Sequence, residues 1–97
     1  MYDNVVHCIV VTIKGLIWNK TNRENIKKHG VKEREVEEAC QGEFENQPTY
    51  GNRVMIFGKT KKGRELTIVL IEKEDSNCLV ITARDMSKKE RRYFLND

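Results

Sequence analysis

The segment RVMIFGKTKKGRELTIVLIEKEDSNCLVITA, residues 53–83, decides the fold. Three runs in it are rich in β-branched and aliphatic residues and predict three β-strands. These runs are Arg53–Gly58, Arg64–Glu72 and Cys78–Ala83. The links between them, KTKKG and KEDSN, are short enough for hairpins. We therefore expect an antiparallel three-stranded meander.

The apolar pattern within the meander also predicts its register. If Leu66 lies opposite Ala83, apolar residues of the last two strands align on one face of the sheet. The same register makes Glu65 and Arg84 neighbours across these strands, and it brings Arg64 to the same end as Arg84. Two arginines that are distant in the sequence are therefore expected to converge at one edge of the sheet.

The residues before the meander predict one strand and two helices. Val5–Ile17 is dense in β-branched residues and predicts a strand. Thr21–Glu24 has the form of a capping box, and the helix that it opens is expected to end at Gly30. A second helix is expected over Lys32–Cys40, and a loop over Gln41–Tyr50.

A second capping box, Ser87–Glu90, predicts a C-terminal helix that runs to about Leu95. The expected fold is therefore α+β, with a mainly antiparallel four-stranded sheet built as strand, two helices, three-strand meander and C-terminal helix. With 97 residues and no linker-like stretch, residues 1–97 are expected to form a single domain.

The charges are segregated along the chain. Lys and Arg number 18 against 15 Asp and Glu, giving a formal charge of +3. Cations gather in Lys20–Lys28, Lys59–Arg64 and Arg84–Arg92, and acids in Glu33–Glu45 and Glu72–Asp75. This pattern is typical either of solvated faces or of a phosphate-binding surface beside an acidic one.

Other classes of protein are disfavoured by what the sequence contains. Three widely spaced cysteines, Cys8, Cys40 and Cys78, favour a reducing cytoplasm over a secreted disulfide scaffold. No metal site is expected at these spacings, and nucleotide-binding loops are absent, so no cofactor is expected. The apolar run Val5–Ile17 is too short and too polar to span a membrane.

The basic segments suit a ribonuclease that needs no metal. The 2′-hydroxyl of RNA is an internal nucleophile, so the protein must supply a base and cations that stabilise the phosphorane. The planar fork of an arginine suits that charge. The catalytic candidates are Arg64, Arg84, His29 and Glu65, and the RNA-binding candidates are Lys28, Arg53, Lys88, Lys89 and Arg92.

Each candidate also has a structural interpretation. His29 lies on a helical stripe with Trp18 and Ile26, so it could buttress the end of the helix, and Trp18 itself could be a core residue. Glu65 and Arg84 could form a cross-strand ion pair. Arg53 could brace a strand edge, and the Lys88–Arg92 segment could be a solvated helix face.

Three blocks of sequence together resemble one protein family. They are Ile17–Trp18–Asn19 followed by NIKKHGV (25–31), then GRELTIV (63–69), then ITARDMSKKERRYF (81–94). Their order and spacing are similar to those of BrnT-family toxins of type II toxin–antitoxin systems.

The resemblance implies a RelE-like fold and a cytoplasmic ribonuclease that cleaves RNA and inhibits translation. It also implies a partner, a BrnA-like ribbon-helix-helix antitoxin. The toxin would contact operator DNA only through this antitoxin. By motif position it carries over Lys28, His29, Arg53, Arg64, Arg84 and Glu90 as functional residues. The chain departs from the family pattern at Asn19, Asn52 and Phe94. A non-catalytic RNA-binding or protein-interaction domain with the same fold is therefore the alternative.

Overall fold

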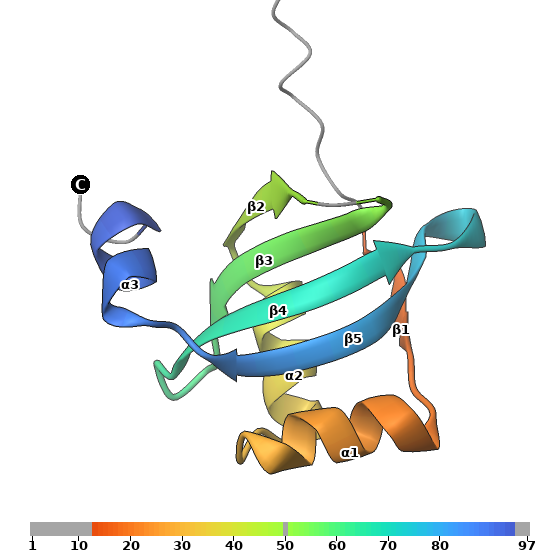
Figure 1. The fold of residues 1–97 in the computed structure, drawn as a ribbon, viewed down its shortest axis with the longest axis horizontal. Helices are drawn as coiled ribbons and strands as arrows, with labels where there is room; N and C mark the ends of the chain where they lie inside the picture. Colours follow the sequence, from red (N-terminus) through yellow and green to blue (C-terminus); the bar gives the residue numbers. More distant parts are fainter. Residues whose placement is uncertain (1–12, 50, 95–97) are drawn as a thin grey trace, which may run out of the picture.

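The three apolar runs form the centre of a five-stranded sheet in the computed structural model, which describes residues 13–49 and 51–94 (Figure 1). The order of the strands is β1–β5–β4–β3–β2. The strands are β1 (Gly15–Ile17), β2 (Phe44–Pro48), β3 (Arg53–Lys59), β4 (Glu65–Glu72) and β5 (Asn77–Asp85). The helices are α1 (Lys20–Lys28), α2 (Glu33–Gln41) and α3 (Lys88–Phe94), with a short 3₁₀ turn, η2, at Glu74–Ser76.

The prediction of an α+β fold is confirmed, but the prediction of four strands is wrong. Residues 44–48, expected to lie in a loop, form β2 and pair antiparallel with β3 at the edge of the sheet. Their sequence, FENQP, hid the strand because its outward positions are polar and it ends in proline. Both features are typical of an edge strand, which pairs on one side only.

The antiparallel meander is confirmed, but the predicted register of β4 and β5 is wrong, by two residues from Leu66 to Val69 and by one residue from Leu70 onward. Ile68, not Leu66, lies opposite Ala83, and Leu66 lies opposite Asp85. An irregularity between Val69 and Leu70 shifts the pairing, and such bulges are invisible to a strict two-residue alternation. As a result Thr67, rather than Glu65, lies opposite Arg84.

The first helix begins earlier than predicted. Its N-cap is Asn19, whose side chain accepts a hydrogen bond from the Asn22 amide, while the Asn22 side chain accepts one from the Asn19 amide. Asparagine is as good an N-cap as serine or threonine, so this pair replaces the box expected at Thr21. The helix ends as expected before Gly30, which has a φ of 69°. The box at Ser87 and Glu90 is confirmed.

The predicted strand Val5–Ile17 lies mostly outside the described residues, and only its end is seen, as β1. This short strand runs parallel to β5, with Ile17 opposite Leu79. Helix α1 then continues along β5, to which the Asn25 side chain donates a hydrogen bond at the carbonyl of Ile81. The two elements together cover the β5 side of the sheet (Figure 1).

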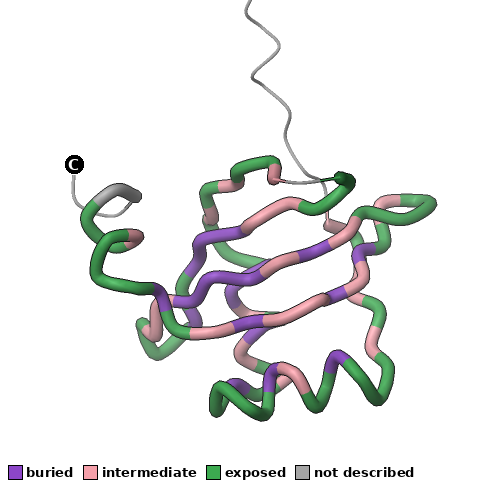
Figure 2. The backbone as a smooth tube through the Cα atoms, viewed as in Figure 1, coloured by how far each residue is buried: buried purple, intermediate pink, exposed green. Residues whose placement is uncertain are grey.

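The core lies between the sheet and the helices α1 and α2 (Figure 2). Its most buried members include Val36, Ala39, Ile56, Leu66, Ile68, Leu70 and Val80. Helix α2 approaches β3 closely at Gly58, where an added Cβ would lie 2.9 Å from the carbonyl oxygen of Ala39. Trp18 packs against this core from its edge, as its structural interpretation predicted. Among the described residues no helix is long and apolar enough to cross a membrane.

Candidate functional site

Arg64 joins four segments at one end of the sheet. Its Nε and Nη2 donate to the two carboxylate oxygens of Asp85, at 2.7 and 3.2 Å. Its Nη1 donates to the Gly30 carbonyl and to Glu35, both at 2.9 Å. A longer contact of 3.5 Å joins Nη2 to the His29 carbonyl. All five N–H groups of this guanidinium therefore have acceptors within the protein.

The charges around Arg64 stabilise one another. Its hydrogen bonds to Asp85, opposed by partial burial, raise the pKa of Arg64 above its ordinary value, and the same contacts lower the pKa of Asp85. The pKa of Glu35 is lowered first by the backbone amide of Lys32 and then by Arg64. The guanidinium also lies at the C-terminal end of α1, where a cation interacts favourably with the helix dipole. Arg64 thus holds the end of α1 against β5.

Arg84 lies next to this network and contacts α3. Its Nη1 and Nη2 donate to the two oxygens of Glu90, at 2.8 and 2.9 Å, and Nη1 also donates to the Asp85 carbonyl at 3.1 Å. Glu90 accepts a further hydrogen bond from the buried Thr67 hydroxyl. The Arg84 hydrogen bonds, more than any other contact, lower the pKa of Glu90 to about 2.

Arg84 differs from Arg64 in one respect that decides what each can bind. Within the described part of the chain, no acceptor contacts Nε of Arg84, and Nη2 contacts only Glu90. The side chain of Arg84 is 38% exposed, against 28% for Arg64. An arginine with Nε and one Nη2 hydrogen free can still bind two oxygens of a phosphate in parallel. Arg84 therefore has an available fork, whereas Arg64 would first have to release Asp85 or Glu35.

The predicted convergence of the two arginines occurs, although through Asp85 rather than by the expected register. The third catalytic candidate, His29, is exposed at the end of α1 beside Lys28, and its carbonyl contacts Arg64. The fourth, Glu65, faces α3 and forms a 2.6 Å ion pair with Arg91, not the predicted pair with Arg84. Three of the four candidates are thus linked in a chain of contacts that runs His29–Arg64–Asp85–Arg84.

The RNA-binding candidates divide into two groups. Lys28, Lys88, Lys89 and Arg92 are exposed on the helices that border this end of the sheet. Arg53 is also exposed but begins β3 at the other end, opposite Ile71. The seven residues of β3 separate Arg53 from the Lys59 end, a span of roughly 20 Å at ~3.4 Å per residue. The structure therefore does not bring Arg53 to the other candidates.

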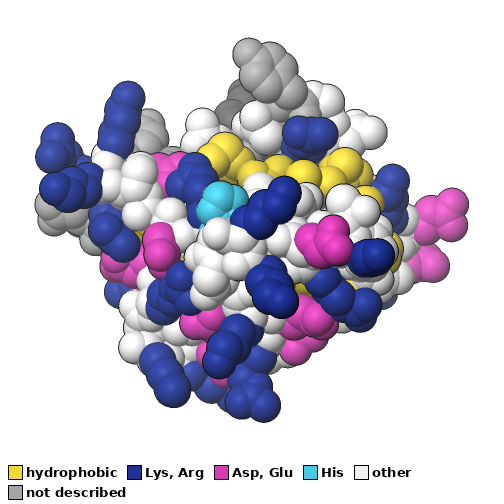
Figure 3. Space-filling model, turned by 60° about the horizontal axis from the view of Figure 1, so that its bottom comes forward, with side chains coloured by type: hydrophobic (Ala, Val, Ile, Leu, Met, Phe, Trp, Pro, Cys, Tyr) yellow, Lys and Arg dark blue, Asp and Glu magenta, His cyan; other side chains and the backbone are white. Residues whose placement is uncertain are grey.

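A basic hollow adjoins the Arg64 network. It lies between the end of α1 and the start of α2, and Gly30, which binds Arg64, contributes to its wall. Three cations line it, Arg23, Lys27 and Lys32, the first of which also contacts Glu33. Figure 3 shows Lys and Arg side chains crowded over this side of the molecule. The hollow offers positive charge to a polyanion close to His29.

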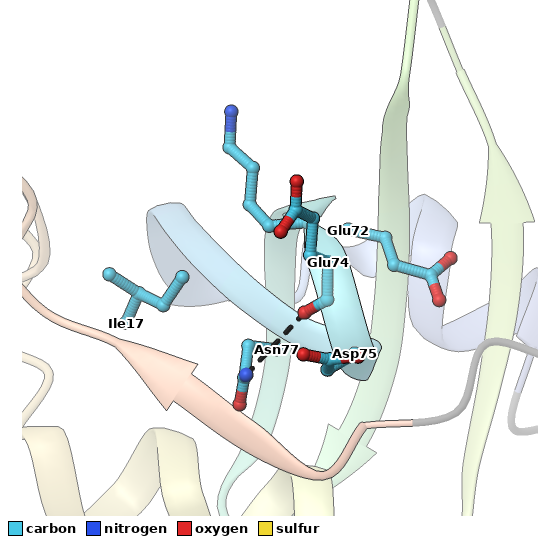
Figure 4. A pocket seen from close by; sticks show the side chains of 6 residues that line it. Ile17, Glu72, Glu74, Asp75 and Asn77 are labelled. Atoms are coloured by element: carbon cyan, nitrogen blue, oxygen red, sulfur yellow. Dashed lines mark hydrogen bonds between the residues drawn. The ribbon is translucent and has the colours of Figure 1, made fainter.

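The opposite end of the sheet is acidic. A hollow at the turn between β4 and β5 is lined by Glu72, Glu74 and Asp75, together with Ile17, Lys73 and Asn77 (Figure 4). Asp75 and Ser76 both have positive φ values, 58° and 62°. Carboxylates at this density repel a phosphate backbone, so the end with Arg64 and Arg84 is the one suited to RNA.

Sequence reasoning missed the acceptors that arrange this site. Asp85, Glu35 and Thr67 were not candidates, yet each contacts Arg64 or Glu90. The adjacent acid in Arg84–Asp85 was a usable signal, since neighbours on a strand face opposite sides and could bind different partners. Glu35 gave no such signal, because an acid in the first turn of a helix is common for its own reasons.

Comparison with known proteins identifies relatives of this fold and sequence. The family model described as "Ribonuclease toxin, BrnT, of type II toxin-antitoxin system" matches residues 18–90. The 1.1 Å crystal structure of the Brucella abortus ribonuclease toxin BrnT superposes with a TM-score of 0.63 at 22% identity, covering 79% of this chain and 100% of that chain. At that identity the superposition shows a shared fold. No curated protein matches the chain in sequence.

Proposed function

This chain belongs to the BrnT family of ribonuclease toxins of type II toxin–antitoxin systems, and we propose that it is itself an endoribonuclease that cleaves RNA in the cytoplasm and inhibits translation. We also propose that its fold is RelE-like and that residues 1–97 act as one domain. A BrnA-like ribbon-helix-helix antitoxin would neutralise it, and operator DNA would be met only through that antitoxin.

The observation that carries this proposal is the open fork of Arg84 beside the Arg64 network. Nε and one hydrogen of Nη2 on Arg84 would bind two oxygens of the scissile phosphate as negative charge develops on it. Glu90 holds the adjacent edge of the same guanidinium at 2.8 and 2.9 Å, which fixes its orientation. Losing one oriented donor of this kind costs on the order of 3 kcal/mol, about a hundredfold in rate.

The remaining candidates have different roles in this proposal. His29 would accept the proton of the 2′-hydroxyl, because it is exposed, whereas the Glu65 carboxylate is already bound by Arg91. Arg64 would be a positioning residue that holds the end of α1, and with it His29, against Asp85. Lys28 and the cations of α3 would bind flanking phosphates. No metal is needed for this chemistry, because the 2′-hydroxyl of RNA supplies the nucleophile and water, or the protonated His29, would give a proton to the leaving 5′-oxygen.

Cleavage of RNA by the purified chain tests the proposal. We expect Arg84→Ala to lower the rate about a hundredfold, measured at a temperature at which the variant is folded, because it also loses the ion pair with Glu90. The matched control is Arg34→Ala, which removes an exposed cation from α2, away from the Arg64 and Arg84 contacts. Products should carry 2′,3′-cyclic phosphate ends, since the internal 2′-hydroxyl attacks.

Two outcomes would contradict this mechanism. If Arg84→Ala cleaved RNA as fast as Arg34→Ala, the open fork would have no role in catalysis. If the wild-type chain bound RNA without cleaving it, with or without EDTA, the alternative of a non-catalytic RNA-binding domain would be favoured. The ion pairing of both arginines in the free protein is the observation that keeps this alternative in view.

A further inference from the structure

The outward face of the sheet, away from α1 and α2, is apolar where a solvated face would be polar. An antiparallel sheet with one buried face normally alternates apolar and polar residues. Here five aliphatic or methionine side chains occupy outward positions on four adjacent strands. They are Ile17, Met55, Val69, Ile71 and Leu79, and together we call them the apolar strip.

The strip is accessible to a partner. Ile17 is 38% exposed and is the one large hydrophobic residue in the exposed class within the described ranges. The four other members are partly exposed. Among the described residues, α3 covers the far end of this face, where it lies over the buried Thr67 and binds it through Glu90. Figure 3 likewise shows hydrophobic side chains gathered in a strip bordered by basic ones.

The dimensions of the strip fit an amphipathic helix. Four strands at ~4.8 Å spacing extend over roughly 14 Å, the length of about three helical turns at 5.4 Å per turn. A protein segment fits this surface better than RNA does, because base stacking needs exposed aromatic rings. Phe57, the aromatic residue of β3 on this face, is only 2% exposed.

The charges along the two long sides of the strip are opposite. At the turn between β4 and β5, Ile17 borders the hollow that contains Glu74 and Asp75 (Figure 4). Arg53 lies on the β3 side of the same row, opposite Ile71, so the acidic character is confined to the turn. Along the other side lie Arg84 and the exposed lysines and arginines of α3. A helix bound along the strip would therefore turn a basic side toward the turn and an acidic side toward α3.

We propose that the apolar strip binds an amphipathic helix of the antitoxin, which lies across the strands with an acidic side toward α3 and a basic side toward the turn between β4 and β5. This rests on the proposed function, which supplies the antitoxin as the partner. The acidic side would cover the open fork of Arg84. Neutralisation then follows directly, because the same guanidinium edge cannot bind a phosphate.

The test uses the full chain coexpressed with the small protein encoded by the adjacent gene. Ile17→Lys and Ile71→Lys place a charge in the strip without touching the proposed catalytic residues. We expect each to weaken the complex at least ~30-fold, as for the anchor residues of an interface, by calorimetry on separately purified chains. RNA cleavage by each free variant should equal that of the wild type. Arg34→Glu, on the outer side of α2, is the matched control and should bind as the wild type does.

Several outcomes of this experiment would overturn the proposed docking of the antitoxin helix on the apolar strip. An affinity within twofold of the wild type in both variants would overturn the proposal. So would loss of RNA binding in place of loss of the complex, or a wild-type dimer that Ile17→Lys dissociates without any effect on the partner. If Ile71→Lys unfolds, Ile17→Lys decides alone, since its side chain is already 38% exposed. If the variants lose the partner but the wild type cleaves no RNA, the docking surface stands and the proposed ribonuclease activity falls.

Discussion

Replacing Glu90 by glutamine should destabilise the protein at neutral pH and have no effect in strong acid. Glu90 is 16% exposed, contacts both Nη atoms of Arg84, and has a pKa of about 2. A glutamate in the unfolded chain has a pKa near ~4.3, and a shift of one pKa unit corresponds to ~1.4 kcal/mol. The stabilisation that ionised Glu90 contributes therefore has an upper limit of about 3 kcal/mol. Because Arg84 is 38% exposed, solvent screens the pair, and about 1–2 kcal/mol is expected.

The sign of the pH dependence follows from the lowered pKa. The stabilisation is complete above the unfolded value and is lost as the pH falls from about 5 toward 2, because protonated Glu90 and glutamine are equivalent there. Urea unfolding of the wild type and of Glu90→Gln at several pH values measures the difference between their free energies of unfolding. Glu33→Gln is the control, since Glu33 and Arg23 are 42% and 54% exposed, and it should cost under ~0.5 kcal/mol. A difference in unfolding free energy between the wild type and Glu90→Gln that is absent at pH 7, or constant down to pH 2, would refute this reasoning.

Three further substitutions test the fold. Arg64→Ala should cost about 1–2 kcal/mol in urea unfolding because it leaves the half-buried Glu35 and the exposed Asp85 without their ion-pair partner, and Arg64→Lys should recover less than half, since an ammonium cannot replace the planar fork. Asn19→Ala should cost about 1 kcal/mol of unfolding free energy and Thr21→Ala under ~0.5 kcal/mol; equal losses would contradict the observed cap. Gly58→Ala should lower stability by about 1–3 kcal/mol, because its Cβ would lie 2.9 Å from the Ala39 carbonyl oxygen; an unchanged melting temperature would show that α2 can move away.

The central part of the fold was predictable because its signals are local. The three strands of the meander and the Ser87–Glu90 box each follow from residues within a few positions of one another. Strand β2 was not predictable in this way. Its residues are polar on the outward side, and the strand exists because β3 offers it an unpaired edge. An edge strand is decided by its neighbour more than by its own propensity.

The site was predictable in its members but not in its geometry. The grouping of Arg64 with Arg84 was expected from a register that is wrong by two residues. The grouping survives because β5 continues to Asp85, which binds one arginine through its carboxylate and the other through its carbonyl. The alternation of apolar and polar residues does not predict the bulge in the pairing of β4 and β5, because the bulge depends on how the two strands twist together.

The two arginines are similar in sequence context but differ in what a phosphate would have to displace. At Arg64 it would displace Asp85 or Glu35 and leave a carboxylate without its partner, which is costly where the pair is partly buried. At Arg84 it would displace no acceptor of the described residues from one edge of the guanidinium, while Glu90 keeps the other edge. Arg84 is therefore the arginine suited to meet the substrate. Arg64 acts through the structure that it holds, since it fixes the end of α1 and the backbone of His29 beside β5.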